Sequence, residues 1–423
     1  MENIHIAGQY NRDELLLKEL KQSELPLFLY GIGLIADTVQ IFLNENGMQI
    51  AGRVIDDKYI DNIQLRTEDS LLSISQLNRQ YPAFNVLLCF FGGYRQDLTP
   101  YRQLFPGAGI VSFLSSVYDR GVLEPMDRDY VTSDIASFNR VCDLLEDKLS
   151  KDSLQAYINA KVTKDASHLF PFVRRPQYFS EHNVIKELTL TRKEIMINCG
   201  AYTGDTLMDF LETVGNKYTK IYACEADSQN VRKLSKFIHN TAPDGNITIV
   251  PKCISNTSEP VCFLNEGTML SRKVETQQTG SVWVESTTID ELLESSPASL
   301  IVMDVEGNEL KALQGARHTI LHHKPLLALA AYHKKDDIPV LFDYLKTLIP
   351  DYKFYFRIHK PMAIDAVLYA VAPLSAAQKK SRLKASIFGG TQRNRTAVLG
   401  FADRCLTTRP GYLEKDCKVN KYF

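Results

Sequence analysis

The chain contains 423 residues, 44% of them apolar, which is enough for two or three domains with ordinary hydrophobic cores. Its formal net charge of -1 gives no general attraction to nucleic acids or to membrane surfaces. The first 20 residues are polar and lack the apolar stretch of a secretion signal, and no apolar run reaches the ~18 residues that span a bilayer. We therefore expect no nucleic-acid partner and no membrane span.

Cysteine usage indicates the compartment. The eight cysteines include no C-x-x-C pair. Cys89, Cys199, Cys224 and Cys253 lie in apolar runs of strand character, where a thiol behaves as a small hydrophobic group. Unpaired thiols suit a reducing compartment, so we expect a cytoplasmic protein.

The first predicted βαβ unit begins with a strand over 27–30, which leads through Gly31 and Gly33 into a helix. A second strand follows over 50–55 and ends at Asp56. An acid about 20 residues beyond a glycine turn is the residue that binds ribose hydroxyls in dinucleotide-binding folds. The pattern predicts a nucleotide or nucleotide-sugar site. The alternative is a turn that only packs the helix on the strand.

Two further strands, over 85–90 and 109–114, extend this pattern. Residues 1–125 are therefore predicted to form a small Rossmann-like α/β domain. It resembles the Rossmann-like N-terminal domains of sugar-modifying enzymes from polysaccharide clusters. No catalytic group accompanies the glycine turn.

Residues 126–190 are predicted to connect this domain to a second one. Two amphipathic helices are indicated between 133 and 162 by apolar residues three and four apart. An aromatic segment, Gln177-Tyr178-Phe179, follows them. We expect this segment to close one edge of the second domain's core.

The second domain, predicted over 191–374, begins with the strand–turn–helix pattern on which the functional interpretation depends. An apolar run ends at Asn198, and Gly200 and Gly204 follow it before a helical segment. Such glycines let the backbone approach a ligand, and the first helical turn offers N–H groups to it. The spacing resembles the first motif of S-adenosylmethionine-dependent methyltransferases, with Asn198 in the place of the usual acid.

The next predicted strand, over 220–224, ends at Glu225, which lies 21 residues beyond Gly204. An acid at this strand tip can accept both hydroxyls of a ribose, as an adenosine cofactor requires. A later irregular stretch over 255–286 contains Gly267, Gly280 and the single tryptophan, Trp283. It is a candidate lid or substrate loop, and the alternative is a peripheral β-hairpin.

Two further strand ends carry polar residues. A strand over 299–303 leads to Asp304 and Glu306, and a strand over 325–332 leads to His333. In a parallel sheet these side chains share one edge with the glycine turn, and open α/β sheets bind ligands at that edge. Two final strands are predicted over 352–358 and 366–371.

The C-terminal stretch 375–423 holds eleven Lys or Arg against three Asp or Glu. It follows the last predicted strand and carries no motif. We expect a basic tail without catalytic residues.

From about residue 133 to 371 the chain resembles the FkbM-type methyltransferases. The motifs that carry the resemblance are Gln177-Tyr178-Phe179, Cys199-Gly200-Ala201-Tyr202-Thr203-Gly204-Asp205-Thr206, Glu225-Ala226-Asp227, Asp304-Val305-Glu306-Gly307-Asn308-Glu309 and Tyr332-His333-Lys334. This resemblance implies a seven-stranded class I methyltransferase fold, S-adenosylmethionine as cofactor, and O-methylation of secondary metabolites or saccharides. The cofactor would contact Gln177, Tyr178, Asn198, Gly200, Ala201, Tyr202, Gly204, Asp205, Thr206, Glu225, Ala226 and Asp304.

We predict His333 as the base that takes the proton of the acceptor hydroxyl, because its ordinary pKa of ~6.5 suits proton uptake near neutrality. Glu306 would orient the acceptor or share that role, and Asp304 completes the catalytic set. The alternatives are a structural histidine at a strand end and an acid that stabilises the first turn of a helix. Asp304, Glu306 and His333 could also bind a divalent metal, but the sequence has no dedicated ligand motif and we expect no metal.

Two other classes of function stay open. One is an oxidoreductase-like enzyme that binds NAD or a nucleotide sugar through Gly31, Gly33 and Asp56. The other is a non-catalytic binding protein, which Asn198 favours because an amide interacts less strongly with the cofactor's ammonium group. The expected partner is a small-molecule or glycan acceptor, and we expect a homo-oligomer.

Overall fold

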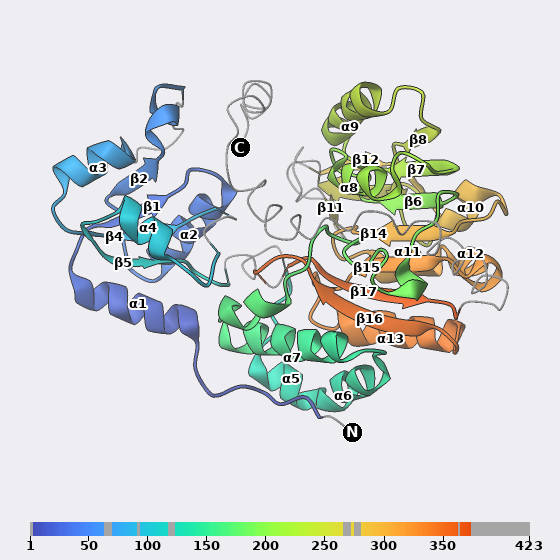
Figure 1. Ribbon diagram of the computed structural model, residues 1–423, viewed down its shortest axis with the longest axis horizontal. Coiled ribbons are helices and arrows are strands. Elements are labelled where there is room, and N and C mark those ends of the chain that lie inside the picture. Colours follow the sequence, from blue (N-terminus) through green and yellow to red (C-terminus); the bar gives the residue numbers. More distant parts are fainter. Residues whose placement is uncertain are drawn as a thin grey trace, which may run out of the picture. The chain divides into compact units, whose positions relative to one another are not determined.

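The computed structural model describes residues 3–62, 70–90, 94–116, 123–264, 272–274, 281–362 and 364–373 (Figure 1). The chain divides into two compact units. In the described residues, the five-stranded unit comprises 11–116, and the seven-stranded unit comprises 3–10 together with 123–373.

The five-stranded unit is a parallel sheet in the order β3-β2-β1-β4-β5. Its strands are β1 Leu27–Tyr30, β2 Gly52–Ile55, β3 Leu71–Ser73, β4 Phe84–Leu88 and β5 Ala108–Ser112. Its helices are α1 Arg12–Ser23, α2 Leu34–Glu45, α3 Ile74–Gln80 and α4 Thr99–Leu104. The order reverses between β1 and β4, so the Gly31 turn, which follows β1, lies at the point where the two halves of the sheet diverge.

The seven-stranded unit contains a sheet in the order β16-β17-β15-β14-β6-β7-β8. Its strands are β6 Ile195–Cys199, β7 Lys220–Cys224, β8 Ile247–Val250, β14 Leu300–Met303, β15 Leu326–Ala330, β16 Lys353–Ile358 and β17 Ala366–Val371. Neighbouring strands run parallel except β17, which is antiparallel to both β15 and β16. The predicted mixed α/β architecture with a class I methyltransferase sheet is confirmed.

The strands of this sheet form where the sequence has short continuous apolar runs. All four residues of β14 are buried, as expected for a strand with both faces covered. The intervening helices are α8 Asp205–Val214, α9 Ser228–Thr241, α10 Ile289–Leu293, α11 Glu309–Gln314, α12 Arg317–His323 and α13 Asp337–Leu348. Asp227 caps α9 by accepting the backbone N–H groups of Gln229 and Asn230.

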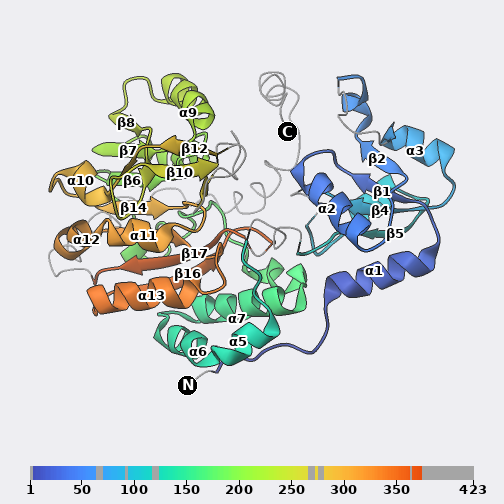
Figure 2. The same ribbon diagram turned by 180° about the vertical axis from the view of Figure 1, so that it is seen from behind.

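The connector forms three helices, α5 Arg128–Ser133, α6 Ile135–Leu144 and α7 Lys148–Thr163, where the sequence predicted two. The two predicted helices correspond to α6 and α7, and α5 precedes the predicted range. Asp147 caps α7 by accepting the N–H of Ser150. The helix α7 packs against β16, and α6 packs against α13 (Figures 1 and 2). The connector helices therefore belong to the seven-stranded unit.

Residues 3–10, here called the N-terminal strap, also pack on these helices. The N–H of Ile4 donates to Asn139 Oδ1 at 2.7 Å, and the N–H of Ala7 donates to Asn159 Oδ1 at 2.9 Å. The backbone of His5 bonds in both directions with the side-chain amide of Gln155. The sequence placed these residues in one domain over 1–125, but side chains of α6 and α7 satisfy their backbone instead.

A small antiparallel sheet, in the order β11-β10-β12, forms within the irregular stretch 255–286. Its strands are β10 Val261–Leu264, β11 Arg272–Lys273 and β12 Ser281–Val284, and a short parallel pair, β9 Cys253–Ile254 and β13 Ser286–Thr287, flanks it. Trp283 is 64% exposed. Gly267 and Gly280, predicted as parts of a lid, lie outside the described residues, as does the tail 375–423.

Within the described residues, no helix is both long and apolar enough to cross a membrane.

Candidate active site

The glycine turn after β6 is built against the end of β14. Gly200 has a φ of +80°, and a Cβ at this position would lie 1.8 Å from the carbonyl oxygen of Asp304. The N–H groups of Gly200 and Ala201 both donate to the carbonyl of Cys224, at 3.0 and 2.9 Å. The turn is thereby fixed between the tips of β7 and β14, where the strand order reverses.

The turn ends at Gly204, which caps α8 with a φ of +102°. A Cβ there would lie 2.3 Å from the Phe237 ring. Tyr202 also has a positive φ of 47°. Asp205 and Thr206 are the first two residues of α8 and follow the turn directly. Burial raises the pKa of Asp205 above its ordinary value.

Asn198 lies within β6, and 1% of its surface is exposed. Its Nδ2 atom has no hydrogen-bond partner among the described residues. A buried amide donor without a partner costs free energy, about 1–3 kcal/mol. The atom is therefore available to a ligand acceptor at the base of the turn.

Glu225 connects the tip of β7 to the glycine turn. Its Oε2 accepts the N–H of Tyr202 at 2.8 Å, and its Oε1 accepts the N–H of Asp227 at 2.8 Å, across the half-buried Ala226. Burial raises the pKa of Glu225 to about 7. The predicted ribose-binding acid thus lies beside the turn, as the spacing implied.

The aromatic segment of the connector contributes one residue to the site. Tyr178 is 5% exposed, and its hydroxyl donates to Asp304 Oδ2 at 2.8 Å. Phe179 packs on Phe210, with ring centroids 5.7 Å apart. Gln177 is half-buried, and its carbonyl accepts the N–H of Phe179 at 2.8 Å.

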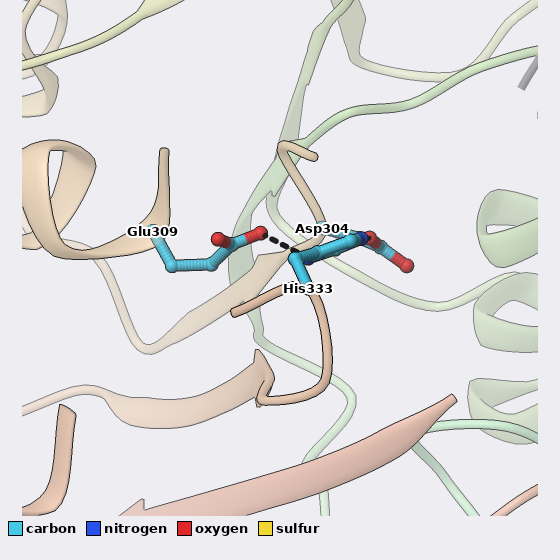
Figure 3. Close-up of side chains that lie close together, drawn as sticks. All are labelled: Asp304, Glu309 and His333. Atoms are coloured by element: carbon cyan, nitrogen blue, oxygen red, sulfur yellow. Dashed lines mark ion pairs between the residues drawn. The ribbon is translucent and has the colours of Figure 1, made fainter. Parts of the chain in front are cut away.

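Asp304, Glu306 and His333 lie together at the tips of β14 and β15. His333 Nε2 is 3.4 Å from Asp304 Oδ1 and 3.4 Å from Glu306 Oε2. His333 Nδ1 is 3.1 Å from Glu309 Oε1, which also accepts the N–H of Val305 at 2.9 Å. Figure 3 shows the His333 ring between Glu309 and Asp304. We call these four residues the His333 cluster.

Two tyrosines and the carboxylates set the charges of this cluster. The hydroxyl of Tyr332, like that of Tyr178, donates to Asp304, at 3.2 Å to Oδ2. Burial alone would lower the pKa of His333, but Glu309 and Glu306 beside the ring raise it well above its ordinary value. The structure therefore gives His333 a pKa above the ordinary value of ~6.5 on which its prediction as a base rested, and that role stays a prediction.

Asp304, Glu309 and His333 offer ligand atoms within 4.8 Å of one another. The imidazole, however, faces Glu309 with Nδ1 and Asp304 with Nε2. An ion bound to one ring nitrogen would lie on one side of the ring, away from the carboxylate on the other side. The arrangement fits a protonated imidazole between carboxylates.

Sequence reasoning did not assign a role to several residues around the cluster. Tyr332 and Glu309 stand next to predicted site residues within their own motifs, which was the available signal. Asp365 and Lys360 come from the loop between β16 and β17, where Lys360 pairs with Asp365. The charge of Asp365 contributes to the raised pKa of Tyr178, after burial and Asp304. Nothing in the local sequence marked that loop.

The predicted nucleotide-binding residues of the five-stranded unit lie at the carboxyl ends of β1 and β2. Gly31 has a φ of +137°, and a Cβ there would lie 2.6 Å from the carbonyl oxygen of Cys89, so packing alone requires this glycine. Gly33 precedes α2, and a Cβ there would meet nothing within 4 Å. Asp56 follows β2, and its charge adds to burial in raising the pKa of Tyr30. Nucleotide binding here stays a prediction.

The comparison with known families matches this geometry. Residues 198–356 match the family model described as the methyltransferase FkbM domain. The match begins at Asn198 and contains the glycine turn, Glu225 and the whole His333 cluster. Residues 198–356 form an FkbM methyltransferase domain. This part of the chain is therefore a methyltransferase domain, as the motifs predicted.

A solved structure agrees with the fold of the chain. The methyltransferase FkbM of Methylobacillus flagellatus is similar, with a TM-score of 0.60 and 21% identity over 84% of this chain and 92% of that chain. An rRNA methylase of Streptococcus thermophilus gives a TM-score of 0.31 with 13% identity, over 48% of this chain and 98% of that one. No curated protein matches the chain.

The buried acid Asp337, next to the His333 cluster, allows the electrostatics of this site to be tested. Asp337 is 5% exposed, and burial together with Glu309 raises its pKa to about 7. In the unfolded chain the same carboxyl group titrates near pH ~3.9. Between these values the folded protein binds the extra proton, so the free energy of unfolding falls as the pH rises through this window.

We therefore expect Asp337→Asn to raise the free energy of unfolding by about 1–3 kcal/mol near pH 8 and to change it little near pH 4. Its amide oxygen can still accept the N–H of Lys334, as Asp337 Oδ2 does at 2.8 Å. Urea unfolding at both pH values measures the difference. Asp343→Asn on the same helix, where the side chain is 47% exposed, is the control. An equal effect of Asp337→Asn at both pH values would contradict the raised pKa of Asp337 in the folded protein.

Proposed function

We propose that the protein transfers a methyl group from S-adenosylmethionine to a hydroxyl group of a saccharide, a polysaccharide precursor or a secondary metabolite. The observation that carries the proposal is the pairing of Glu225 with the glycine turn at the tip of β7. A carboxylate held there by two backbone N–H groups keeps lone pairs for a ribose. Asn198 Nδ2 and Asp205 would bind the polar methionine end.

The charge of the site supports a positively charged donor. Buried or partly buried carboxylates dominate it, and Glu225 and Asp304 both have a pKa raised to about 7, first of all by burial. A bound cation would favour their ionised forms. When bound, S-adenosylmethionine supplies an electrophilic methyl group on a positively charged sulfur.

A hydroxyl acceptor is supported by the groups at the tip of β14. An alcohol must lose a proton as it attacks, so a carboxylate or histidine within reach accelerates the reaction. Asp304 and Glu306 are partly exposed at 23% and 21% and lie where an acceptor can reach them. The saccharide assignment rests on the resemblance of both units to sugar-modifying enzymes.

The experiment for this proposal is methyl transfer from isotope-labelled S-adenosylmethionine to a panel of hydroxyl-bearing glycans and metabolites. Mass spectrometry should detect one labelled methyl group on oxygen. Calorimetry with S-adenosylmethionine and with NAD, each on the full chain, separates this function from the oxidoreductase alternative. Binding of NAD without S-adenosylmethionine would overturn the proposal, and binding of neither would favour a non-catalytic protein.

We expect Glu225→Ala to weaken S-adenosylmethionine binding by ~1.5–3 kcal/mol, since hydrogen bonds to a charged acceptor contribute about that much. Calorimetry should show a loss of ~10- to 150-fold in affinity. The exposed Glu212→Gln on α8 is the control for a lost charge. Unchanged affinity in Glu225→Ala would refute the ribose assignment.

A further inference from the structure

His333 is enclosed by acids on both sides of its ring. Its Nδ1 faces Glu309, and its Nε2 faces both Asp304 and Glu306. The side chain is 4% exposed, and Glu309 behind it is fully buried. An acceptor hydroxyl would have to displace a carboxylate to reach either nitrogen.

Asp304 is placed differently from His333. Its side chain is 23% exposed, so an acceptor can touch it. Its backbone carbonyl lies where a Cβ on Gly200 would be, which fixes it against the glycine turn. Asp304 therefore stands beside the predicted donor site, at the point where the strand order reverses.

Two buried hydroxyls fix the orientation of Asp304. Tyr178 donates to Oδ2 at 2.8 Å from the connector side, and Tyr332 lies within 3.3 Å of both oxygens from the β15 side. A carboxylate has about four lone-pair positions, so it can hold these contacts and still accept a proton.

We propose that Asp304 accepts the proton of the acceptor hydroxyl, and that His333, held in place by Glu309, is a positioning residue that supplies a fixed positive charge beside it. This rests on the proposed function, since it concerns the acceptor of an O-methyl transfer. It replaces His333 by Asp304 as the residue that touches the reacting oxygen.

The charges around Asp304 agree with this assignment. Burial raises its pKa to about 7, while His333 counteracts part of that rise. A carboxyl group that titrates near neutrality is suited to take up and release a proton there. The titratable groups that act on Asp304 or donate to it are Tyr178, Glu306, Glu309, Tyr332, His333 and Asp365.

In this step the acceptor's O–H bond breaks, and its proton binds a carboxylate oxygen of Asp304. The acceptor oxygen uses its electron pair to form a bond to the methyl carbon, and the electron pair of the broken carbon–sulfur bond remains on sulfur. Asp304 becomes a neutral acid and the sulfur loses its positive charge, so the total charge is conserved. The proton then leaves Asp304 to water.

The first test measures the protonation state of His333 in the full chain without any donor or acceptor. NMR of histidine-labelled protein, with the His333 signal identified from its loss in His333→Gln, should show a ring that stays charged well above the ordinary histidine pKa of ~6.5. Glu309→Gln should lower the pKa of His333. A His333 ring that is neutral at pH ~7 would overturn the proposal.

The second test is the pH dependence of turnover in two variants. We expect Asp304→Asn to lower turnover ~10²–10⁴-fold, with donor affinity changed less than about tenfold. Asp336→Asn, an acid at the start of α13 whose side chain does not cap the helix, is the control for a lost charge. His333→Gln should move the acid limb of the rate profile to higher pH, because Asp304 loses its positive neighbour, and the rate should recover at alkaline pH.

The opposite outcome is well defined. If His333→Gln removes the acid limb and stays slow at every pH, His333 is the base and the proposal is wrong. The double variant His333→Gln with Glu309→Gln leaves a neutral hydrogen-bonding pair, and its profile should resemble that of His333→Gln if the single variant folds poorly. Calorimetry of the unmodified chain with S-adenosylmethionine tests the proposed function by itself. The NMR result does not depend on donor binding, so a failure of the proposed function can be told apart from a failure of this proposal.

Discussion

Gly200→Ala is expected to abolish donor binding and to destabilise the seven-stranded unit severely. The new Cβ would lie 1.8 Å from the carbonyl oxygen of Asp304, which is backbone and cannot move without shifting β14. The φ of +80° adds about 1–2 kcal/mol of strain for a residue with a side chain. Thermal unfolding and calorimetry with S-adenosylmethionine measure the two losses.

Gly215→Ala separates the steric clash of the new Cβ from the strain of a positive φ. Gly215 ends α8 with a φ of +63°, and a Cβ there would meet nothing within 4 Å. This variant should lose about 1–2 kcal/mol and keep its donor affinity. If Gly200→Ala lowered the free energy of unfolding no more than Gly215→Ala, the glycine turn would not pack closely on β14.

Arg357→Met is expected to cost about 3–5 kcal/mol of folding free energy, the range seen when one partner of a buried ion pair is removed. Arg357 on β16 is 1% exposed and bonds Asp147 Oδ2 at 2.7 Å and Glu181 Oε1 at 3.1 Å. Methionine fills a similar volume but leaves Glu181, whose side chain is 6% exposed, in the interior without a cation, while Asp147 is 33% exposed. Urea unfolding measures the loss.

Lys353→Met on the same strand is the matched control. Lys353 pairs with Glu146 and Glu187, but these three side chains are 23% to 34% exposed. Partly exposed pairs contribute about 0–1 kcal/mol, so the loss should stay within that range. Similar losses for Arg357→Met and Lys353→Met would show that burial of the Arg357 pair does not decide its contribution.

The sequence was sufficient for the parallel part of the fold because its signals are local. An apolar run such as that of β14 reads as a strand without reference to distant residues, and the glycines after β6 mark a turn. Parallel strands bring their carboxyl ends to one edge, so Gly200, Glu225 and Asp304 could be placed together before their distances were known.

The enclosure of His333 by acids could not be obtained this way. The sequence shows that His333 follows β15, but its enclosure depends on Glu309 from α11 and on the direction of two carboxylates. Tyr178 meets Asp304 across 126 residues of chain. Such contacts are set by packing, to which the spacing of residues along the chain gives no access.

The connector shows a smaller gap. The two helices predicted between 133 and 162 correspond to α6 and α7, but the short helix α5 Arg128–Ser133 before them was not predicted. Its 6 residues make fewer than two helical turns, too few for an apolar period to show.

The N-terminal strap packs on α6 and α7 of the seven-stranded unit, and residues 11–116 then form the five-stranded unit. The five-stranded unit is therefore an insertion within the sequence of the seven-stranded unit. A shortened protein that begins at residue 126 would leave the side-chain amides of Asn139, Gln155 and Asn159 without the backbone partners that residues 4–7 provide. Excising residues 11–116 while keeping residues 1–10 on a linker would preserve those bonds. The seven-stranded unit is therefore discontinuous in sequence. It would be isolated by deleting the internal residues 11–116, not by removing the N-terminus.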